Sequence, residues 1–97
     1  MFEIYWTHQS QSDYNRLKSD ASLHKRCKAV KKTIQLLSAG PRHNSLQTHE
    51  FTSLKGPQGE KIFEAYAEQS TPAAYRVFWY YGPSKVQITI IAITKHP

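Results

Sequence analysis

A single arginine stands inside a run of aromatic and β-branched residues in the last quarter of the sequence. The run covers residues 74–83 and carries Arg76 near its start, and a second apolar run over residues 86–94 leads into Lys95 and His96. Such runs are typical of buried strands, where a guanidinium costs free energy unless a partner satisfies it. An arginine set in an aromatic surface suits the binding of a phosphate or a stacked base. Strand alternation gives Arg76 the same face as Ala74, Phe78 and Tyr80.

Two helices are predicted in the amino-terminal half, where they must help to position these residues. Ser10 followed by Asp13 has the spacing of a capping box, which predicts a helix from about residue 11. Ser19 or Asp20 is expected to cap the second helix, and the Gly-Pro pair at 40–41 ends it. Tyr14 and Leu17 are expected to point inward from the first helix. Spacings of four and three form one apolar stripe on the second helix: Leu23, Cys27, Val30, Ile34 and Leu37.

Period-two alternation predicts strands on both sides of these helices. The expected strands cover residues 2–6, 49–54, 61–68, 75–81 and 86–94, with turns at 56–59, 70–72 and 82–84. Short turns imply antiparallel neighbours, and the apolar character of the last two strands predicts that they lie centrally under the helices. The expected fold class is α+β, a single domain over residues 1–97. Two N-terminal helices pack on a twisted, mostly antiparallel sheet of four to five strands.

Composition favours a small intracellular protein. The chain has 97 residues, 39% of them hydrophobic, which suits one compact core. Cys27 is the only cysteine, so that no internal disulfide can form and a reducing compartment is expected. The first residues do not have the pattern of a signal peptide, and no segment is apolar enough for a membrane span. A cytoplasmic location without a membrane partner is therefore the expectation.

Positive charge is concentrated in the second predicted helix. The formal net charge is +6, and the helix carries Lys25, Arg26, Lys28, Lys31 and Lys32 with no acidic residue among them. At about 100° per residue, three of these lysines point away from the apolar stripe: Lys25, Lys28 and Lys32. The charge favours an acidic or polyanionic partner. The alternative is a solvated helix face that only keeps the protein soluble.

The order of elements and four short segments resemble the RelE/ParE superfamily of bacterial toxins. The segments are Leu54-Lys55-Gly56, Ile62-Phe63-Glu64-Ala65-Tyr66, Tyr75-Arg76-Val77 and the Ile-rich strand before Lys95-His96-Pro97. The resemblance implies a small toxin that a cognate antitoxin holds inactive, with a toxin–antitoxin heterotetramer as one possible assembly. Most members cut mRNA on the ribosome, and the ParE branch acts on DNA gyrase.

The resemblance implies roles for three residues in cleavage of RNA without a metal. The 2′-hydroxyl attacks the adjacent phosphate, which requires a base, a cation for the phosphoryl oxygens and an acid for the leaving 5′-oxygen. Arg76 matches the family's arginine after Tyr and suits the cationic role, the alternative being a structural ion pair with Glu64 or Glu68. His96 matches the histidine of the YoeB type and suits the general acid, the alternative being a solvated tail residue.

The base and the RNA contacts are less closely matched to the family. Glu64 stands in the strand where the RelE type has lysines. It is either the general base, a surface residue, or the partner of Arg76 in an ion pair. His49 is the other candidate base, or else a polar residue of an edge strand. Lys55, Lys61 and Lys95 are predicted to contact the RNA backbone. Tyr66, Tyr80 and Tyr81 are either stacking platforms for bases or core residues.

The resemblance to the RelE/ParE superfamily implies a ribosome-dependent mRNA endonuclease toxin that works without a metal or another cofactor, and this is the expected function. The five histidines do not share a short ligand spacing with a carboxylate or a cysteine, so that a zinc site is not expected. The predicted partners are a cognate antitoxin, mRNA and the ribosome. Two alternatives stay open: a ParE-like inhibitor of DNA gyrase, and a non-catalytic member that only binds antitoxin or RNA.

Overall fold

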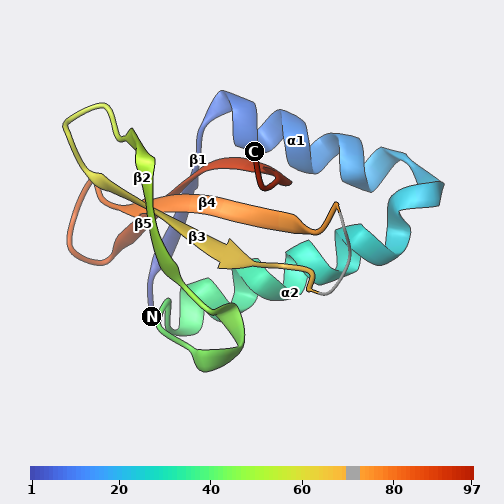
Figure 1. The fold of residues 1–97 in the computed structure, drawn as a ribbon, viewed down its shortest axis with the longest axis horizontal. Helices are drawn as coiled ribbons and strands as arrows, with labels where there is room; N and C mark the ends of the chain where they lie inside the picture. The colour runs from blue at the N-terminus through green and yellow to red at the C-terminus, as the bar shows by residue number, and fades with distance from the viewer. Residues whose placement is uncertain (70–72) are drawn as a thin grey trace.

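Five strands and two α-helices make up the fold in the computed structural model, which describes residues 1–69 and 73–97. In chain order the elements are β1 (Glu3–Trp6), α1 (His8–Ser19), a 3₁₀ turn (Ala21–Leu23), α2 (His24–Ala39), a second 3₁₀ turn (Asn44–Leu46), β2 (His49–Lys55), β3 (Lys61–Tyr66), β4 (Tyr75–Tyr81) and β5 (Gln87–Lys95). The turn predicted over residues 70–72 lies outside the described residues. Figure 1 shows both helices beside a strongly twisted sheet.

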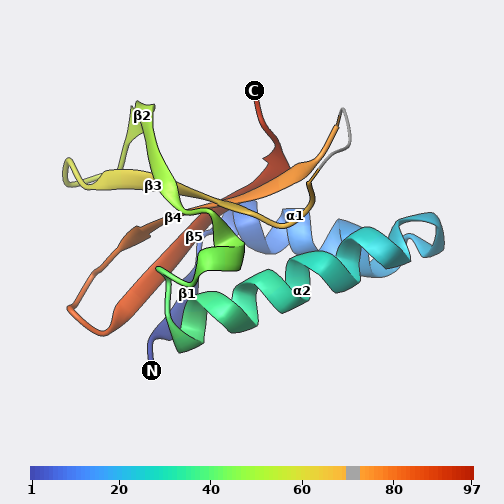
Figure 2. The ribbon, with the colours of Figure 1, turned by 60° about the horizontal axis from the view of Figure 1, so that its bottom comes forward.

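The strands form one sheet in the order β1-β5-β4-β3-β2. β1 runs parallel to β5, and the other neighbouring pairs are antiparallel. The predicted α+β class with a mostly antiparallel sheet is therefore confirmed, with both helices inserted between β1 and β2. β4 is the middle strand and β5 lies next to it, as the apolar character of these two strands predicts. Figure 2 shows that both helices cover the same face of the sheet.

The predicted start of the first helix is wrong by three residues. α1 begins at His8, and its N-cap is Thr7 in an extended conformation. The Thr7 hydroxyl accepts a hydrogen bond from the backbone N–H of Ser10 at 3.1 Å, and the Ser10 hydroxyl accepts one from the backbone N–H of Thr7 at 3.0 Å. Ser10 is thus the second residue of the capping box instead of its first. Asp13 has a different role, because its Oδ2 accepts a hydrogen bond from the backbone N–H of Ile93.

The second helix starts later than the cap prediction places it. Asp20 caps the 3₁₀ turn, where its Oδ1 accepts a hydrogen bond from the backbone N–H of Ser22 at 2.9 Å. α2 itself begins at His24 without a side-chain cap. It ends at Ala39 with Gly40 as its C-cap, which confirms the predicted end.

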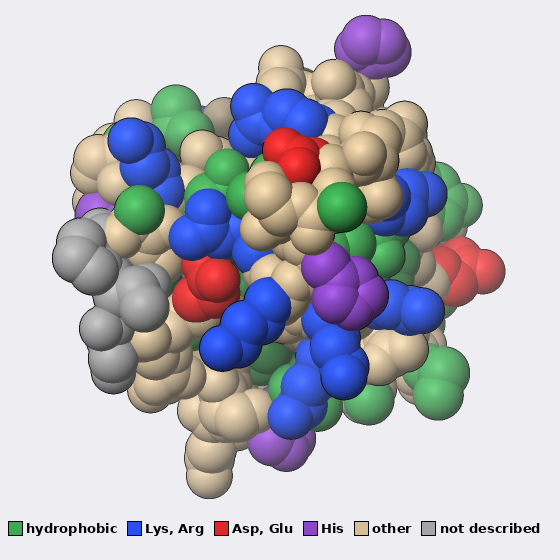
Figure 3. Space-filling view, turned by 90° about the vertical axis from the view of Figure 1, so that its right-hand side faces the viewer, with side chains coloured by type: hydrophobic (Ala, Val, Ile, Leu, Met, Phe, Trp, Pro, Cys, Tyr) green, Lys and Arg blue, Asp and Glu red, His purple; other side chains and the backbone are tan. Residues whose placement is uncertain are grey.

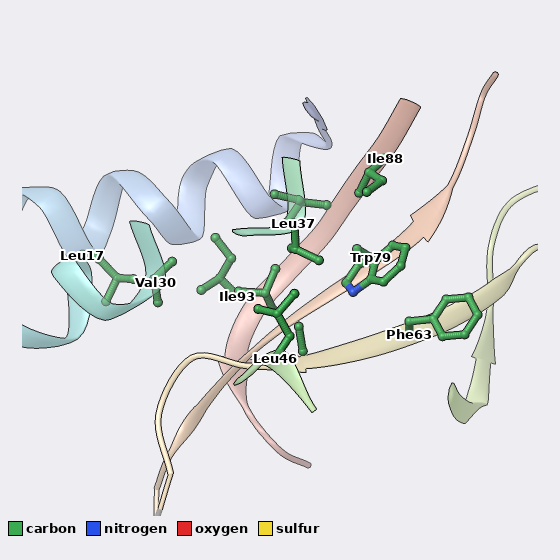
Figure 4. Close-up of a cluster of buried hydrophobic side chains, with 11 residues drawn as sticks. Leu17, Val30, Leu37, Leu46, Phe63, Trp79, Ile88 and Ile93 are labelled. Carbon is green, nitrogen blue, oxygen red and sulfur yellow. The ribbon is translucent and has the colours of Figure 1, made fainter. Parts of the chain in front are cut away.

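The main core lies between the helices and the sheet (Figure 4). Two residues of the predicted stripe, Val30 and Leu37, are fully buried, and the other three pack against the core. Leu17 is buried as expected, and Tyr14 packs against the same cluster. On the sheet side of this core, Trp79 is fully buried, and its ring stacks on Phe63 at a centroid distance of 5.0 Å.

A smaller apolar cluster lies on the face that the helices leave open. Its buried members are Ile62, Phe78 and Tyr80, and Phe51, Ile91 and Ala92 pack against them. β2 pairs with β3 near its two ends, with a register shift between Glu50 and Lys55. This irregular pairing lets β2 rise away from the helices (Figure 2) and brings the Phe51 ring to 5.2 Å from Phe78.

Candidate active site

Glu64 is a buried carboxylate at the centre of the open face. It belongs to β3, where its register partners are His49 on β2 and Phe78 on β4. Its side chain is 1% exposed, so that the predicted alternative of a surface role is wrong. A buried carboxylate requires charged or hydrogen-bonding partners, because the loss of its hydration is otherwise uncompensated.

Three side chains surround this carboxylate. His96 Nδ1 makes a short hydrogen bond to Glu64 Oε2. His49 Nε2 lies 2.8 Å from Oε1, close enough for an ion pair although the angle is not that of an aligned hydrogen bond. Arg76 Nε lies 3.8 Å from Oε2. The structure therefore brings together all three predicted catalytic residues and the second candidate base.

His96 reaches Glu64 from just beyond β5, two strands away in the sheet. Its ring stands nearly perpendicular to the Phe51 ring, at 85° and a centroid distance of 5.7 Å. The side chain is 51% exposed, and its Nε2 has no hydrogen-bond partner among the described residues. The alternative of a merely solvated tail residue does not fit this geometry.

His49 is held on the other side of the carboxylate. Its Nδ1 donates to the backbone carbonyl of Gln47 at 3.1 Å, and its ring meets Tyr66 edge-on at 5.6 Å. The side chain is 46% exposed. Both ring nitrogens therefore face oxygen atoms of the protein.

Arg76 is anchored in the sheet. Its Nη1 donates to the carbonyl oxygens of Glu68, Ala74 and Tyr75, at 3.1, 3.2 and 3.4 Å. The guanidinium carbon lies 3.8 Å from the centroid of the Tyr66 ring, and the side chain is 14% exposed. The predicted face is confirmed by the common open-face position of Phe78 and Tyr80. Arg76 thus combines the predicted structural pairing with a fixed positive charge beside Glu64.

The predicted RNA-contacting lysines lie away from this cluster. Lys55 and Lys61 are register partners at the far end of β2 and β3, and alternation gives Lys61 the face opposite Glu64. Lys95 pairs with Tyr75, whose ring contacts Arg26 of α2. Lys95 is therefore on the helix side and His96 is on the open face. All three lysines are exposed.

The three tyrosines do not offer free stacking surfaces. Arg76 covers one face of Tyr66, Tyr80 is 9% exposed, and Tyr81 packs against the main core. Their geometry fits the predicted alternative of core residues.

The cationic surface of α2 lies on the other side of the molecule. Lys25, Lys28, Lys31 and Lys32 are exposed, and we call these four residues the α2 lysine ridge. Arg26 is not part of it, because its Nε pairs with Glu68 Oε1 at 2.9 Å and its guanidinium lies over Tyr75. Figure 3, which looks onto the end where α1 runs into α2, shows Lys and Arg side chains outnumbering acidic ones.

Sequence reasoning missed the part that Gln47 plays at the site. Its backbone is left-handed, with a φ of 48°, and its carbonyl accepts the His49 N–H. Glutamine is not a residue that signals this conformation, and therefore the sequence pattern held no sign of it. Over residues 1–69 and 73–97, no group of three His, Cys, Asp or Glu side chains is placed to hold a metal ion.

Solved structures of bacterial toxins share this arrangement of strands and helices over the whole chain. A YoeB/ParE toxin from Agrobacterium tumefaciens superposes with a TM-score of 0.72 at 16% identity, covering 99% of this chain and 100% of that one. The chain has the RelE/ParE toxin fold. A YoeB dimer from Staphylococcus aureus gives a TM-score of 0.61 at 18% identity over 99% and 98% of the two chains. The intact E. coli RelBE toxin–antitoxin complex gives 0.64 at 11% identity over 100% and 99%.

The RelE/ParE fold is recognised here through structure. No protein-family model matches the sequence, and no curated protein does. None of the helices in the described part of the chain has the length and apolar character that crossing a membrane requires. The RelE/ParE resemblance predicted from the four short segments is thus confirmed at the level of the fold.

Proposed function

We propose that this protein is the toxin of a type II toxin–antitoxin system and cleaves mRNA on the ribosome without a metal. The observation that carries the proposal is the cluster on the open face, where buried Glu64 contacts His96 and His49 and lies beside Arg76. The RelE/ParE fold and the toxins among its structural neighbours support the same function.

The roles follow from the requirements of 2′-hydroxyl attack. His96 is the general acid, because its ring is half exposed and its Nε2, which has no partner among the described residues, can give a proton to the leaving 5′-oxygen. Arg76 supplies positive charge for the phosphoryl oxygens. Of the two candidate bases, His49 is the more exposed, and it can take the proton of the 2′-hydroxyl only when its Nε2 is unprotonated and has left Glu64 Oε1.

The proposed partners are a cognate antitoxin, the ribosome and mRNA. Three residues of the α2 lysine ridge, Lys25, Lys28 and Lys32, are proposed to receive carboxylates of the antitoxin, since α2 carries no acidic side chain. The exposed Lys55, Lys61 and Lys95 are proposed to contact RNA that extends past the site. A toxin–antitoxin heterotetramer is the corresponding assembly, and the cytoplasm is the corresponding compartment.

Pulse labelling after induced expression tests this proposal. Synthesis of protein should stop before synthesis of DNA, and His96→Ala should abolish the arrest. His24→Ala is the matched control, because His24 is an exposed histidine at the start of α2. Earlier loss of DNA synthesis with gyrase-linked breaks would instead establish the ParE-like function. No effect on either synthesis would establish a non-catalytic member.

A further inference from the structure

We infer that Glu64 is a positioning residue whose carboxylate fixes the proton of His96 on Nδ1 and thereby presents Nε2 to the substrate. The catalytic meaning of this assignment rests on the proposed function. The geometry behind it does not, because it consists of contacts within the folded chain.

The burial of Glu64 excludes direct contact with a substrate in this structure. The side chain is 1% exposed. Ile62 lies two residues before it in β3 and Phe78 is its register partner in β4, and both belong to the apolar cluster of the open face. A general base has to come within hydrogen-bond distance of the hydroxyl that it deprotonates. Glu64 does not meet this requirement, so that it can act on a substrate only through a side chain that reaches the surface, and His96 is such a side chain.

Both carboxylate oxygens already have partners, and these come from different strands. Oε1 faces His49 of β2, and Oε2 faces His96 beyond β5 with Arg76 Nε of β4 nearby. The two histidines and the arginine hold the carboxylate from opposite sides and restrict its rotation. An ionised carboxylate is only an acceptor, so that the hydrogen shared with His96 belongs to Nδ1.

This assignment sets the direction of proton transfer. With Nδ1–H directed at Glu64, the other ring nitrogen is the one that exchanges protons at the surface. When the His96 imidazolium gives its Nε2 proton to the leaving 5′-oxygen, the Nδ1 proton stays on the ring and the imidazole becomes neutral. Glu64 keeps its charge and stabilises the charged imidazolium before the transfer.

The test is the tautomer of His96, measured by long-range ¹⁵N–¹H correlation NMR on protein labelled in histidine. At a pH where the ¹⁵N shifts of His96 are those of a neutral imidazole, the wild-type ring should carry its hydrogen on Nδ1. An unrestrained neutral imidazole favours the Nε2–H form. The signals of His96 are identified among those of the five histidines by comparison with His96→Gln, which removes one set.

Two variants of Glu64 and one control complete the design. Glu64→Leu cannot accept a hydrogen bond and should shift His96 to the Nε2–H form. Glu64→Gln retains one oxygen and should keep more of the Nδ1–H form. The control is Glu50→Gln. Glu50 follows His49 in β2 and pairs with Phe63, so that this variant removes a nearby carboxylate other than Glu64 and should leave the tautomer of His96 unchanged.

A wild-type His96 with its hydrogen on Nε2 overturns the inference, and so does a Glu64→Leu variant with the wild-type tautomer. If Glu64→Leu fails to fold by circular dichroism, the wild-type and Glu64→Gln spectra still decide. RNA is not needed for this measurement. A protein that shows the expected tautomers but does not arrest translation therefore disproves the proposed function and not the role of Glu64 in orienting His96.

Discussion

Asp13 in α1 accepts a hydrogen bond from the backbone N–H of Ile93 in β5, with 2.9 Å between Oδ2 and the nitrogen. β1 pairs with β5 only as far as Trp6 and Ile90. Beyond that point α1 takes over the edge of β5, because the Thr7 hydroxyl also donates to the carbonyl of Ile91 at 3.1 Å. The helix therefore fixes the segment of β5 that leads to His96.

Asp13→Ala should lower the free energy of unfolding by about 1–3 kcal/mol, because it leaves a part-buried N–H without an acceptor. Asp13→Asn should cost less, since an amide oxygen can replace the carboxylate oxygen. Urea denaturation measures both. Gln9→Ala is the control, because Gln9 bonds the other oxygen of Asp13 at the surface. An equal effect of Gln9→Ala would show that the bond to Ile93 does not matter.

His96→Ala should reduce mRNA cleavage in a translation extract on the order of 100-fold or more, as expected for loss of a general acid. Far-UV circular dichroism should be unchanged, because the ring is half exposed. His24→Ala should cleave as the wild type does. Full activity of His96→Ala would place the acid on another residue.

Arg76→Lys keeps the charge and removes the guanidinium, whose Nη1 donates to three carbonyl oxygens. We expect cleavage to fall on the order of 100-fold, because the remaining charge is no longer held in a fixed position. The melting temperature should also fall, since the hydrogen bonds from Nη1 to the backbone are lost. A variant that melts lower and cleaves normally would give Arg76 a structural role alone.

Replacement of Lys25, Lys28 and Lys32 by Glu should slow association with the antitoxin and reduce the salt dependence of the association rate. Stopped-flow mixing measures both quantities. Replacement of Lys55, Lys61 and Lys95 by Glu makes the same change of charge elsewhere and serves as the matched control. Weaker binding to 70S ribosomes with normal antitoxin association would assign the α2 lysine ridge to rRNA.

Burial, and secondly the nearby Cys27, raise the pKa of the Tyr14 phenol above 10.0. The unfolded chain then loses this proton at lower pH than the folded protein does. Stability therefore falls as pH rises above the pKa that Tyr14 has in the unfolded chain. Tyr14→Phe should remove this part of the alkaline loss. Unfolding free energies measured for both proteins across the alkaline range should diverge, with the variant losing less. Parallel curves would contradict the assignment.

Local pattern was sufficient for the type and order of the main helices and strands, although not for where each helix begins. The alternation in β4 predicted its bounds and placed Arg76 with Phe78 and Tyr80, because a half-buried strand leaves its period in the sequence. The same alternation places Lys95 and His96 on opposite faces of the sheet. Applied to these two residues, it would have excluded Lys95 from the face that carries the site. The start of α1 was missed because Thr7 and Ser10 are both residue types that cap helices, and the hydrogen bonds from Thr7 to β5 are not visible in the local pattern.

The convergence on Glu64 depends on pairing between strands, which local pattern does not give. His49 faces Glu64 through the β2–β3 register, and His96 arrives from a strand that is not a neighbour of β3. The sequence marked each residue for its chemistry. Only the order of the strands shows that one carboxylate serves two histidines.

The parallel pairing of β1 with β5 also affects how the chain folds. Glu3 is the register partner of Gln87, so that the first strand of the sequence stays unpaired until the last strand has been synthesised. Contacts of such long sequence separation form slowly, because a long loop has to close first. A nascent chain that ends before β5 has neither His96 nor the partner of β1. Assembly of the site is therefore a late event in synthesis, and partially translated chains are without the histidine that we propose as the general acid.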